Sequence, residues 1–595
     1  MKLDLSSLRS LYSSGQARPV DVVQTVYDRI ATASHQPIWI SLVPRDAALS
    51  RAREVENDPA AGARPLYGVP FAIKDNIDLA GLPTTAACPA YSYSPKRSAS
   101  VVARLLEAGA IAIGKTNMDQ FATGLVGTRS PHGACSSVFD DRYVSGGSSS
   151  GSAVAVARQL VSFSLGTDTA GSGRVPAAFN NLIGLKPTRG SLSISGVVPA
   201  CRTLDCVSVF ATTCHDAHAV WREAKGFDPL DSFSRTARVG QNAAPWLHGR
   251  FRFGVPSADQ LEFFGDAQAE NLYQRAISDL ERIGGQRVEI DFSTFRAASD
   301  LLYAGPWVAE RMAAIRQFAE NNADEMNPVV RGIIGGAKRY SAVDAFEAEY
   351  RLCDLRRATE REWERMDVLV LPTAGTIYTH DEIAADPVRL NSNLGYYTNF
   401  VNLLDLAAVA IPAGFRSNGL PFGISLIGSA FTDEALLALA DRYHRVHADV
   451  PGPAVDLGTC PPGCVAVAVL GAHLAGQPLN WQLTERGARL LRTTRTHPGY
   501  HLYALEGTRP PKPGLVREAG FDGPGIEVEI WAVPEDQFGG FVAAVAPPLA
   551  IGAAMLETGE TVKCFVCEPY AITGAPDITR FGGWRSYLAS SKTQI

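Results

Sequence analysis

The hydrophobic pattern of the first 450 residues alternates between helical and strand-like segments. Residues 1–60 are predicted to be helical, because apolar side chains recur at helical spacing from Pro19 to Ile30. Further helices are predicted over residues 100–108, 153–160 and 435–447, and strands over 67–78, 110–113, 161–165, 367–372 and 407–412. This alternation predicts a mixed α/β fold in which helices flank a large central sheet.

The pattern changes after residue 450. Residues 450–463 read VPGPAVDLGTCPPG, a composition typical of a linker. Beyond it lie four strand-like runs and one weak helical pattern over residues 485–492; the runs cover 464–470, 500–505, 526–534 and 562–567. We therefore predict a large catalytic domain over 1–450, a linker over 451–463 and a small α+β domain over 464–595.

Composition narrows the class of protein. A chain of 595 residues is too long to fold around a single hydrophobic core. Its content of 46% hydrophobic and 19% charged residues is ordinary for a globular protein. The net charge of −6 argues against nucleic-acid binding, because no basic block is available to displace counterions. No secretory signal or membrane span is visible, and the ten scattered cysteines are expected to be free thiols. We expect a cytoplasmic protein.

Two formal motif matches are rejected on their context. Gly109 to Thr116 fits the phosphate-loop pattern, but its four variable residues form the strand itself and no apolar helix follows. Cys564 and Cys567 form a CxxC inside a predicted strand, where their side chains would point to opposite faces. Neither a metal nor a cofactor is expected.

Residues 145–186 place serines and glycines in two tight loops, 146–152 and 167–173. Glycine lets a backbone approach another group closely and direct amide hydrogens toward it. Three interpretations compete. Residues 147–151 match the GxSxG nucleophile elbow, although no apolar strand precedes them and no histidine is singled out downstream. Alternatively the loops are structural turns, or one serine is a nucleophile whose base is a lysine.

The third interpretation agrees with a resemblance. Lys74 in GVPFAIKDN, the loop GGSSSGSA, and GTDTAGSGRVPA followed by GLKPT resemble the amidase signature family over roughly residues 20–450. The resemblance implies a Ser–cis-Ser–Lys triad, with Ser172 as nucleophile, Ser148 as bridge after a cis peptide bond, and Lys74 as base. The two serines are 24 residues apart, as in the family pattern.

The chemistry of this triad is physically consistent. A serine hydroxyl needs a base, and a free lysine with a pKa of about 10.4 is protonated at neutral pH. Burial disfavours the ammonium form and lowers that pKa, so Ser148 can pass the proton of Ser172 to Lys74. The turn after the second loop is expected to form an oxyanion hole worth about 2.7–4 kcal/mol per donor. Its donors would be the backbone amides of Thr169, Ala170, Gly171 and Ser172.

Three neighbours of the triad are expected to be structural. Ser149 and Ser150 would make hydrogen bonds within the loop. Arg174, two residues beyond the nucleophile, would pair with Asp168.

Substrate choice rests on a finer resemblance. Residues 114–133, 171–190 and 301–315 resemble allophanate-hydrolysing members of the family, in which Tyr303 and Arg311 would hold the substrate carboxylate. Eight residues along a straight helix would separate the two by about 12 Å. Gly305-Pro306 removes this difficulty if Pro306 starts a helix, with Tyr303 on the preceding loop and Arg311 in the second turn.

The tail resembles the γ-glutamyl cyclotransferase-like domain that these members carry. Residues 465–480 would be its opening strand and loop, and the resemblance implies that His473 assists decarboxylation of the first product. His497 and His501 are alternatives, and each histidine could instead be structural.

The expected function is hydrolysis of allophanate (urea-1-carboxylate) to ammonia and N-carboxycarbamate, which decarboxylates, in urea or s-triazine nitrogen catabolism. No biotin-type lysine motif is visible, so a separate urea carboxylase is expected to supply the substrate. The resemblance also implies a homodimer through the amidase domain. The alternatives are an amidase of another small acidic amide such as malonamate, the amidotransferase subunit that charges glutaminyl-tRNA, and a scaffold without activity.

Overall fold

A computed structural model describes residues 1–33, 36–58, 64–236, 251–455, 460, 463–557 and 559–592. These residues form two compact units, a first unit up to Val455 and a second unit beyond it. The division falls inside the predicted linker, of which residues 456–459 and 461–462 lie outside the described part.

The first unit is built on one mixed sheet, as predicted. Two sets of parallel strands, β3–β2–β4 and β9–β7–β8, lie on either side of an antiparallel middle, and β1 adds an antiparallel edge beside β3. Its central strands are buried along their whole length, including the polar residues at their ends, such as Asp168 and Lys186. In spatial order the strands are β1 (Trp39–Leu42), β3 (Ile111–Thr116), β2 (Pro70–Lys74), β4 (Phe163–Asp168), β6 (Cys206–Ala211), β5 (Ile183–Lys186), β10 (Leu406–Phe415), β11 (Pro421–Ser429), β9 (Val368–Pro372), β7 (Phe251–Pro256) and β8 (Gly285–Ile290).

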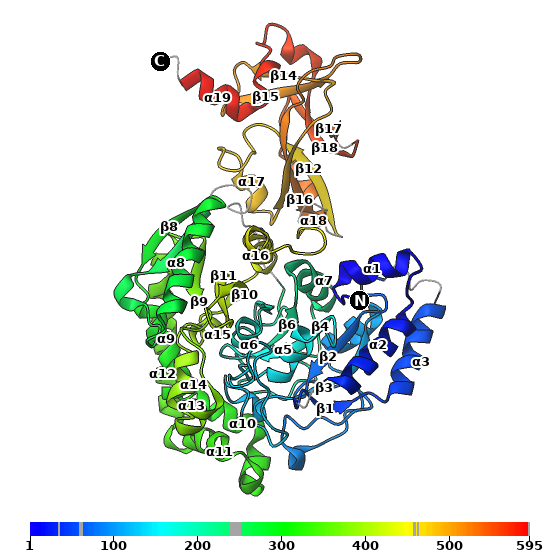
Figure 1. The fold of residues 1–595 in the computed structure, drawn as a ribbon. Coiled ribbons are helices and arrows are strands. Elements are labelled where there is room, and N and C mark those ends of the chain that lie inside the picture. Colours follow the sequence, from blue (N-terminus) through cyan, green and yellow to red (C-terminus); the bar gives the residue numbers. More distant parts are fainter. Residues whose placement is uncertain are drawn as a thin grey trace. The chain divides into compact units, whose positions relative to one another are not determined.

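Helices surround this sheet (Figure 1). Helices α5 and α6 pack against each other and on the central strands, while α4, α7, α16 and α8 form a second series of contacting helices. The helices of the unit are α1 (Leu5–Ser13), α2 (Pro19–Thr32), α3 (Arg45–Asn57), α4 (Ser100–Glu107), α5 (Ser150–Ala157), α6 (Val175–Phe179), α7 (Cys214–Ala224), α8 (Ala267–Arg282), α9 (Ser293–Ala304), α10 (Trp307–Asn321), α11 (Pro328–Gly335), α12 (Ala342–Trp363), α13 (His380–Ala385), α14 (Arg389–Leu394), α15 (Phe400–Leu403) and α16 (Asp433–His447).

One part of the predicted helical N-terminus is wrong. Residues 39–42 form strand β1, which pairs antiparallel with β3 at the edge of the sheet. A four-residue edge strand is too short to leave a period in the sequence, and its register shifts between Trp39 and Ser41.

The second unit contains a five-stranded sheet and a separate hairpin. The sheet strands are β13 (Arg489–Arg495), β16 (Glu527–Pro534), β12 (Cys464–Val469), β18 (Thr561–Cys567) and β17 (Leu549–Met555), the hairpin strands are β14 (Tyr500–Leu505) and β15 (Lys512–Arg517), and the helices are α17 (Trp481–Thr484), α18 (Glu535–Ala543) and α19 (Trp584–Lys592). The predicted helix over 485–492 is wrong. Pairing with β16 places residues 489–495 in a strand, and the β-branched Thr493 and Thr494 favour that state.

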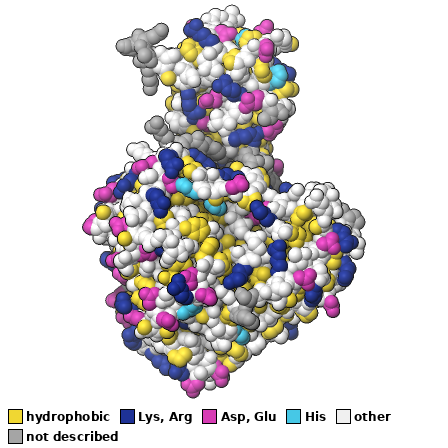
Figure 2. All heavy atoms as spheres, viewed as in Figure 1, with side chains coloured by type: hydrophobic (Ala, Val, Ile, Leu, Met, Phe, Trp, Pro, Cys, Tyr) yellow, Lys and Arg dark blue, Asp and Glu magenta, His cyan; other side chains and the backbone are white. Residues whose placement is uncertain are grey.

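Surface and thiol chemistry are unremarkable in the described residues. On the face shown in Figure 2, acidic and basic side chains are interspersed and form no large patch of one sign. All ten cysteines are free. None of the helices in the described ranges is both long and apolar enough to cross a bilayer.

Candidate active site

Lys74 ends strand β2 and is completely buried. Its Nζ donates to Ser148 Oγ at 2.8 Å and to Thr167 Oγ1 at 2.8 Å. Burial lowers the pKa of Lys74 to about 7, against the opposing pull of Asp119, Asp168 and Asp205. An amine in this setting exchanges a proton near neutral pH.

Ser148 lies at the entrance to α5, and its peptide bond with Gly147 is cis, as the resemblance implies. The loop has no room for a side chain before Ser148, because a Cβ added to Gly147 would lie 2.2 Å from Asp119 Oδ2. The Ser148 carbonyl accepts a hydrogen bond from the amide of Asp119 at 3.1 Å. The backbone on both sides of Ser148 is therefore fixed, which directs its hydroxyl to Lys74.

The two neighbouring serines make bonds within the fold, as expected. Ser149 Oγ donates to the carbonyl of Thr167 at 3.2 Å, and Ser150 Oγ donates to the carbonyl of Asn117 at 3.4 Å. Neither hydroxyl is directed to Lys74.

Ser172 is nearly buried and follows the turn after β4. Its Oγ donates to the carbonyl of Gly124 at 3.5 Å. Among the described residues Ser148 is not its hydrogen-bond partner, so the Lys74–Ser148 link is formed here and the Ser148–Ser172 link is not.

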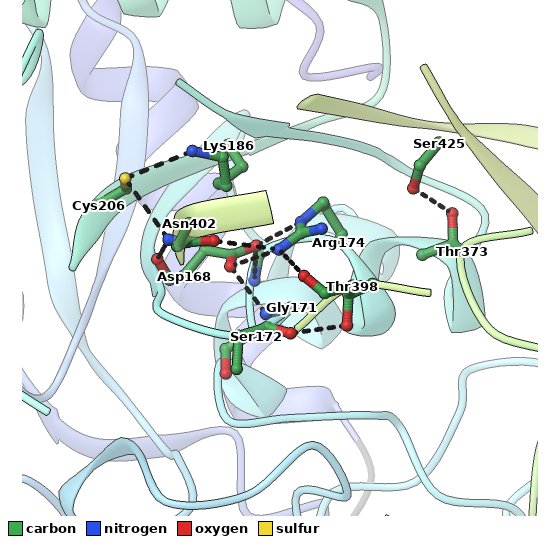
Figure 3. A network of polar contacts seen from close by, with 12 residues as sticks. Asp168, Gly171, Ser172, Arg174, Lys186, Cys206, Thr373, Thr398, Asn402 and Ser425 are labelled. Carbon is green, nitrogen blue, oxygen red and sulfur yellow. Dashed lines mark hydrogen bonds and ion pairs between the residues drawn. The ribbon is translucent and has the colours of Figure 1, made fainter. Parts of the chain in front are cut away.

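The turn before Ser172 is held by a polar network (Figure 3). Asp168 accepts two hydrogen bonds from Arg174, each at 2.9 Å, which is the predicted pairing. Asp168 also accepts from the amides of Gly171 at 2.8 Å and Gly173 at 3.0 Å. Thr398 Oγ1 donates to the carbonyl of Ala170 at 2.6 Å. The network fixes the turn on which an oxyanion hole would depend.

The predicted oxyanion donors differ in whether their amides already donate a hydrogen bond within the chain. No acceptor lies on the amides of Thr169, Ala170 or Ser172 within the part of the chain that is described. The amide of Gly171 is directed to Asp168 instead. Three of the four predicted donors thus have no hydrogen-bond acceptor among the described residues.

Asp205 is a residue that the sequence analysis missed. Its carboxylate accepts from Thr169 Oγ1 and from the amides of Ala200 at 2.8 Å and Cys201 at 3.2 Å. Burial raises the pKa of Asp205 to about 6. It lies 37 residues beyond Asp168 in sequence with no motif around it, so only the pairing of β4 with β6 brings it to the site.

Tyr303 and Arg311 come together as the resemblance implies. Arg311 Nη2 donates to Tyr303 OH at 3.3 Å, and the guanidinium lies 5.3 Å from the centre of the Tyr303 ring. Tyr303 lies in the last turn of α9 and not on a loop, so that expectation is wrong. Gly305 and Pro306 separate the two helices, and Arg311 lies in the second turn of α10 as predicted. The break between α9 and α10 brings the side chains together.

Arg311 is fully buried and has no carboxylate within 4.0 Å among the described residues. Its Nη1 donates to Thr123 Oγ1 at 3.1 Å and to the carbonyl of Ala122 at 3.4 Å, while Nε has no partner. A buried guanidinium without a counter-ion favours an anionic ligand.

His473 lies in the second unit, after β12. Its ring stacks on Phe565 with centroids 4.8 Å apart, and its Nε2 lies 2.9 Å from Gln482 Oε1. Burial lowers the pKa of His473, so the ring is neutral near pH 7. The rivals differ: His497 Nδ1 accepts from the amide of Gly499 at 3.1 Å, and His501 lies 3.1 Å from both Asp577 and Glu518.

No group of three or more metal-ligating side chains is placed to hold an ion in the described residues. The candidate chemistry of the first unit is carried by hydroxyls, one amine and backbone amides.

The comparisons with known proteins agree with one another on the family of this chain. The profile described as Amidase matches residues 21–437, and that described as Allophanate hydrolase C-terminal domain matches residues 465–589. The solved allophanate hydrolase of Kluyveromyces lactis is 43% identical, with a TM-score of 0.80 over 98% of each chain. The urea amidolyases of Saccharomyces cerevisiae and Lachancea kluyveri are 44% and 45% identical over 98% and 94% of this chain. The chain covers 33% and 31% of these two proteins, about a third of their length.

Proposed function

Since this chain is an amidohydrolase that belongs to the amidase family and carries an allophanate hydrolase C-terminal domain, we propose that it hydrolyses allophanate (urea-1-carboxylate). The observation that carries the proposal is the buried Arg311 guanidinium, which has no carboxylate within 4.0 Å in the described residues. An isolated buried charge is costly, and a carboxylate that arrives with the substrate offsets this cost. The guanidinium fork suits such a carboxylate, and the Tyr303 hydroxyl adds a second donor.

The first step uses the triad. Neutral Lys74 accepts a proton from Ser148, and Ser148 in turn accepts the proton of Ser172 as its Oγ attacks the amide carbonyl carbon. The free amides of the turn, those of Thr169, Ala170 and Ser172, stabilise the oxyanion of the tetrahedral intermediate.

The intermediate collapses when the C–N bond breaks and ammonia leaves with the proton that Lys74 returns through Ser148. Water then attacks the acyl-enzyme, with the same residues removing its proton, and N-carboxycarbamate is released. Loss of CO2 from this product, with His473 as the candidate residue that assists it, leaves carbamate. Carbamate decomposes, so the net products are two ammonia and two CO2 per allophanate.

Several further points remain predictions. A urea carboxylase would supply the substrate, in a pathway of urea or s-triazine breakdown. The chain would form a homodimer through the amidase domain, which light scattering would check. It would lie in the cytoplasm, which cell fractionation would check. The amidotransferase alternative is disfavoured, because the second unit matches a domain described for allophanate hydrolases. The alternative kept is a related amidase of another small carboxylated amide such as malonamate.

The test is ammonia release by the purified chain from allophanate and from malonamate. We expect a kcat/KM for allophanate at least about a hundredfold higher, and Arg311→Met to lower it by a similar factor through loss of a charged hydrogen bond. Arg316→Met is the matched control, because Arg316 lies on the same helix with its side chain 73% exposed. Preference for malonamate would favour the alternative, and equal loss in both variants would remove Arg311 from the site.

A further inference from the structure

Four arginines are buried with less than a tenth of their surface exposed in the described part of the chain: Arg129, Arg174, Arg311 and Arg416. Arg174 pairs with Asp168 and Arg416 with Asp266, each at 2.9 Å. No carboxylate of the described residues lies within 4.0 Å of the Arg129 or Arg311 guanidinium. Two of these buried guanidiniums therefore have a carboxylate in direct contact and two do not, although Asp119 acts on Arg129 and Asp205 acts on Arg311 through space.

The two arginines without a carboxylate in direct contact meet on one residue. Arg129 Nη1 donates to the Thr123 carbonyl at 2.9 Å, and Arg311 Nη1 donates to Thr123 Oγ1 at 3.1 Å. The next residue, Gly124, accepts the hydrogen bond of Ser172 Oγ at 3.5 Å. Both guanidiniums therefore contact Thr123, the residue before the Gly124 carbonyl to which Ser172 donates.

Arg129 is held in place by carbonyl oxygens and not by a carboxylate in direct contact. Its Nη2 donates to the carbonyl of Pro387 at 2.6 Å, and its Nε is buried without a partner, as is the Nε of Arg311. Asp119 accepts from the backbone amides of Gly127 and Arg129, at 3.0 and 2.9 Å, and not from the guanidinium. Carbonyl oxygens satisfy donors but cancel no net charge.

We propose that Arg129 is a specificity-determining residue. Held by the Thr123 carbonyl, it supplies a second positive charge, which makes the site prefer anionic over neutral amides. The proposal rests on the proposed function for the choice of anion. Arg311 is the group expected to touch the substrate carboxylate, and Arg129 acts through Thr123 and through space. The charge of Arg129 acts over a longer distance in a buried site than in water, because the low local dielectric screens charge poorly.

A second consequence concerns the hydrolysis product. N-carboxycarbamate carries two carboxylates where allophanate carries one, so the negative charge in the site increases during the reaction. Two arginines without a carboxylate in direct contact suit a dianion better than one does.

Binding of malonate, a dianion of the same shape as N-carboxycarbamate, tests the proposal without turnover. Isothermal titration calorimetry on the full chain would compare the wild type with Arg129→Met, Arg129→Lys and the exposed control Arg316→Met. We expect Arg129→Met to raise the malonate Kd at least about tenfold, and Arg129→Lys and Arg316→Met to stay within about threefold. Thermal melting checks that each variant is folded, and Arg129→Gln replaces Arg129→Met if the latter is not.

Three outcomes would overturn the proposal: no malonate binding by the wild type, unchanged binding in Arg129→Met, or equal weakening in Arg129→Met and Arg129→Lys. The last would mean that the shape of the side chain matters and its charge does not. Failure of the proposed function is seen separately, because it is read from allophanate turnover by the wild type.

Discussion

The amine of Lys74 lies 2.8 Å from the hydroxyl of Ser148, and neither side chain is exposed to solvent. Because bulk water is excluded, the ammonium form of Lys74 loses solvation that its neighbours only partly replace. The lysine is therefore a usable base near neutral pH, and this relationship between two residues 74 positions apart makes a histidine unnecessary.

The first prediction concerns pH. Lys74 must be neutral to accept a proton, so kcat/KM is expected to be low below the folded pKa of about 7 and to rise tenfold per pH unit up to it. The measurement is kcat/KM for ammonia release between pH 5 and 9. Lys74→Met should abolish activity, whereas the exposed Lys96→Met should keep the full profile. A profile with no acid limb near pH 7 would contradict the assignment of Lys74 as base.

The second prediction separates adjacent serines. Ser148→Ala removes the hydroxyl that contacts Lys74, and we expect kcat to fall by about a thousandfold or more. Ser149→Ala removes a hydroxyl whose hydrogen-bond partner among the described residues is Thr167, and we expect less than a tenfold change. Steady-state kinetics on both variants, with thermal melting as a folding check, decides the point. Similar losses in the two variants would show that the loop, and not the Ser148 hydroxyl, is required.

The candidate triad could be predicted from sequence because its residues lie in long ordered motifs around Lys74, Ser148 and Ser172. The residues that support them could not. Asp205, Thr398 and Asn402 reach the turn at Asp168 from distant segments, and a single polar residue beside an apolar run carries no local signal. Their roles depend on tertiary contacts that only the folded chain defines.

The fold divides in a similar way. Strand β9, which is buried on both faces, forms a continuous apolar run and was predicted, and the predicted strand over 161–165 overlaps β4. Strand β13 was predicted as a helix, because its surface pattern is mixed and its state is decided by pairing with β16. The contact of Tyr303 with Arg311 was predicted, although the helix end that carries Tyr303 was not.

The third prediction concerns Tyr303. Tyr303→Phe keeps the ring beside Arg311 and removes the hydroxyl that Arg311 contacts. We expect KM for allophanate to rise about tenfold, the value of one lost hydrogen bond, with kcat little changed. Tyr340→Phe is a suitable control, because its hydroxyl donates to the carbonyl of Ala304 at an exposed position. A fall in kcat without a change in KM would place Tyr303 in the chemical step.

The fourth prediction concerns stability. Asp168→Ala leaves the Arg174 guanidinium buried without its carboxylate, and removes the acceptor of the Gly171 and Gly173 amides. Loss of one partner of a buried ion pair costs about 3–5 kcal/mol, so we expect the free energy of unfolding to fall by that amount. Urea denaturation measures it.

The double variant Asp168→Ala, Arg174→Met removes both charges and serves as the control for that change. It should be more stable than Asp168→Ala alone. If the double variant is less stable, the carboxylate acts mainly on the amides of the turn, and the charge of Arg174 is not the cause.

The last prediction concerns the second unit. His473 is held between Phe565, Phe541 and Gln482, so its ring is fixed and neutral near pH 7. If it assists decarboxylation, His473→Ala should leave the rate of ammonia release from the first step unchanged and slow CO2 release from N-carboxycarbamate at least about tenfold. Rapid quenching with carbon-13 allophanate, followed by NMR of the carboxylates, resolves the two steps. His497→Ala and His501→Ala are run beside it, since a slower second step in either would transfer the role to that residue. Unchanged CO2 release in all three variants would assign the second unit no part in decarboxylation.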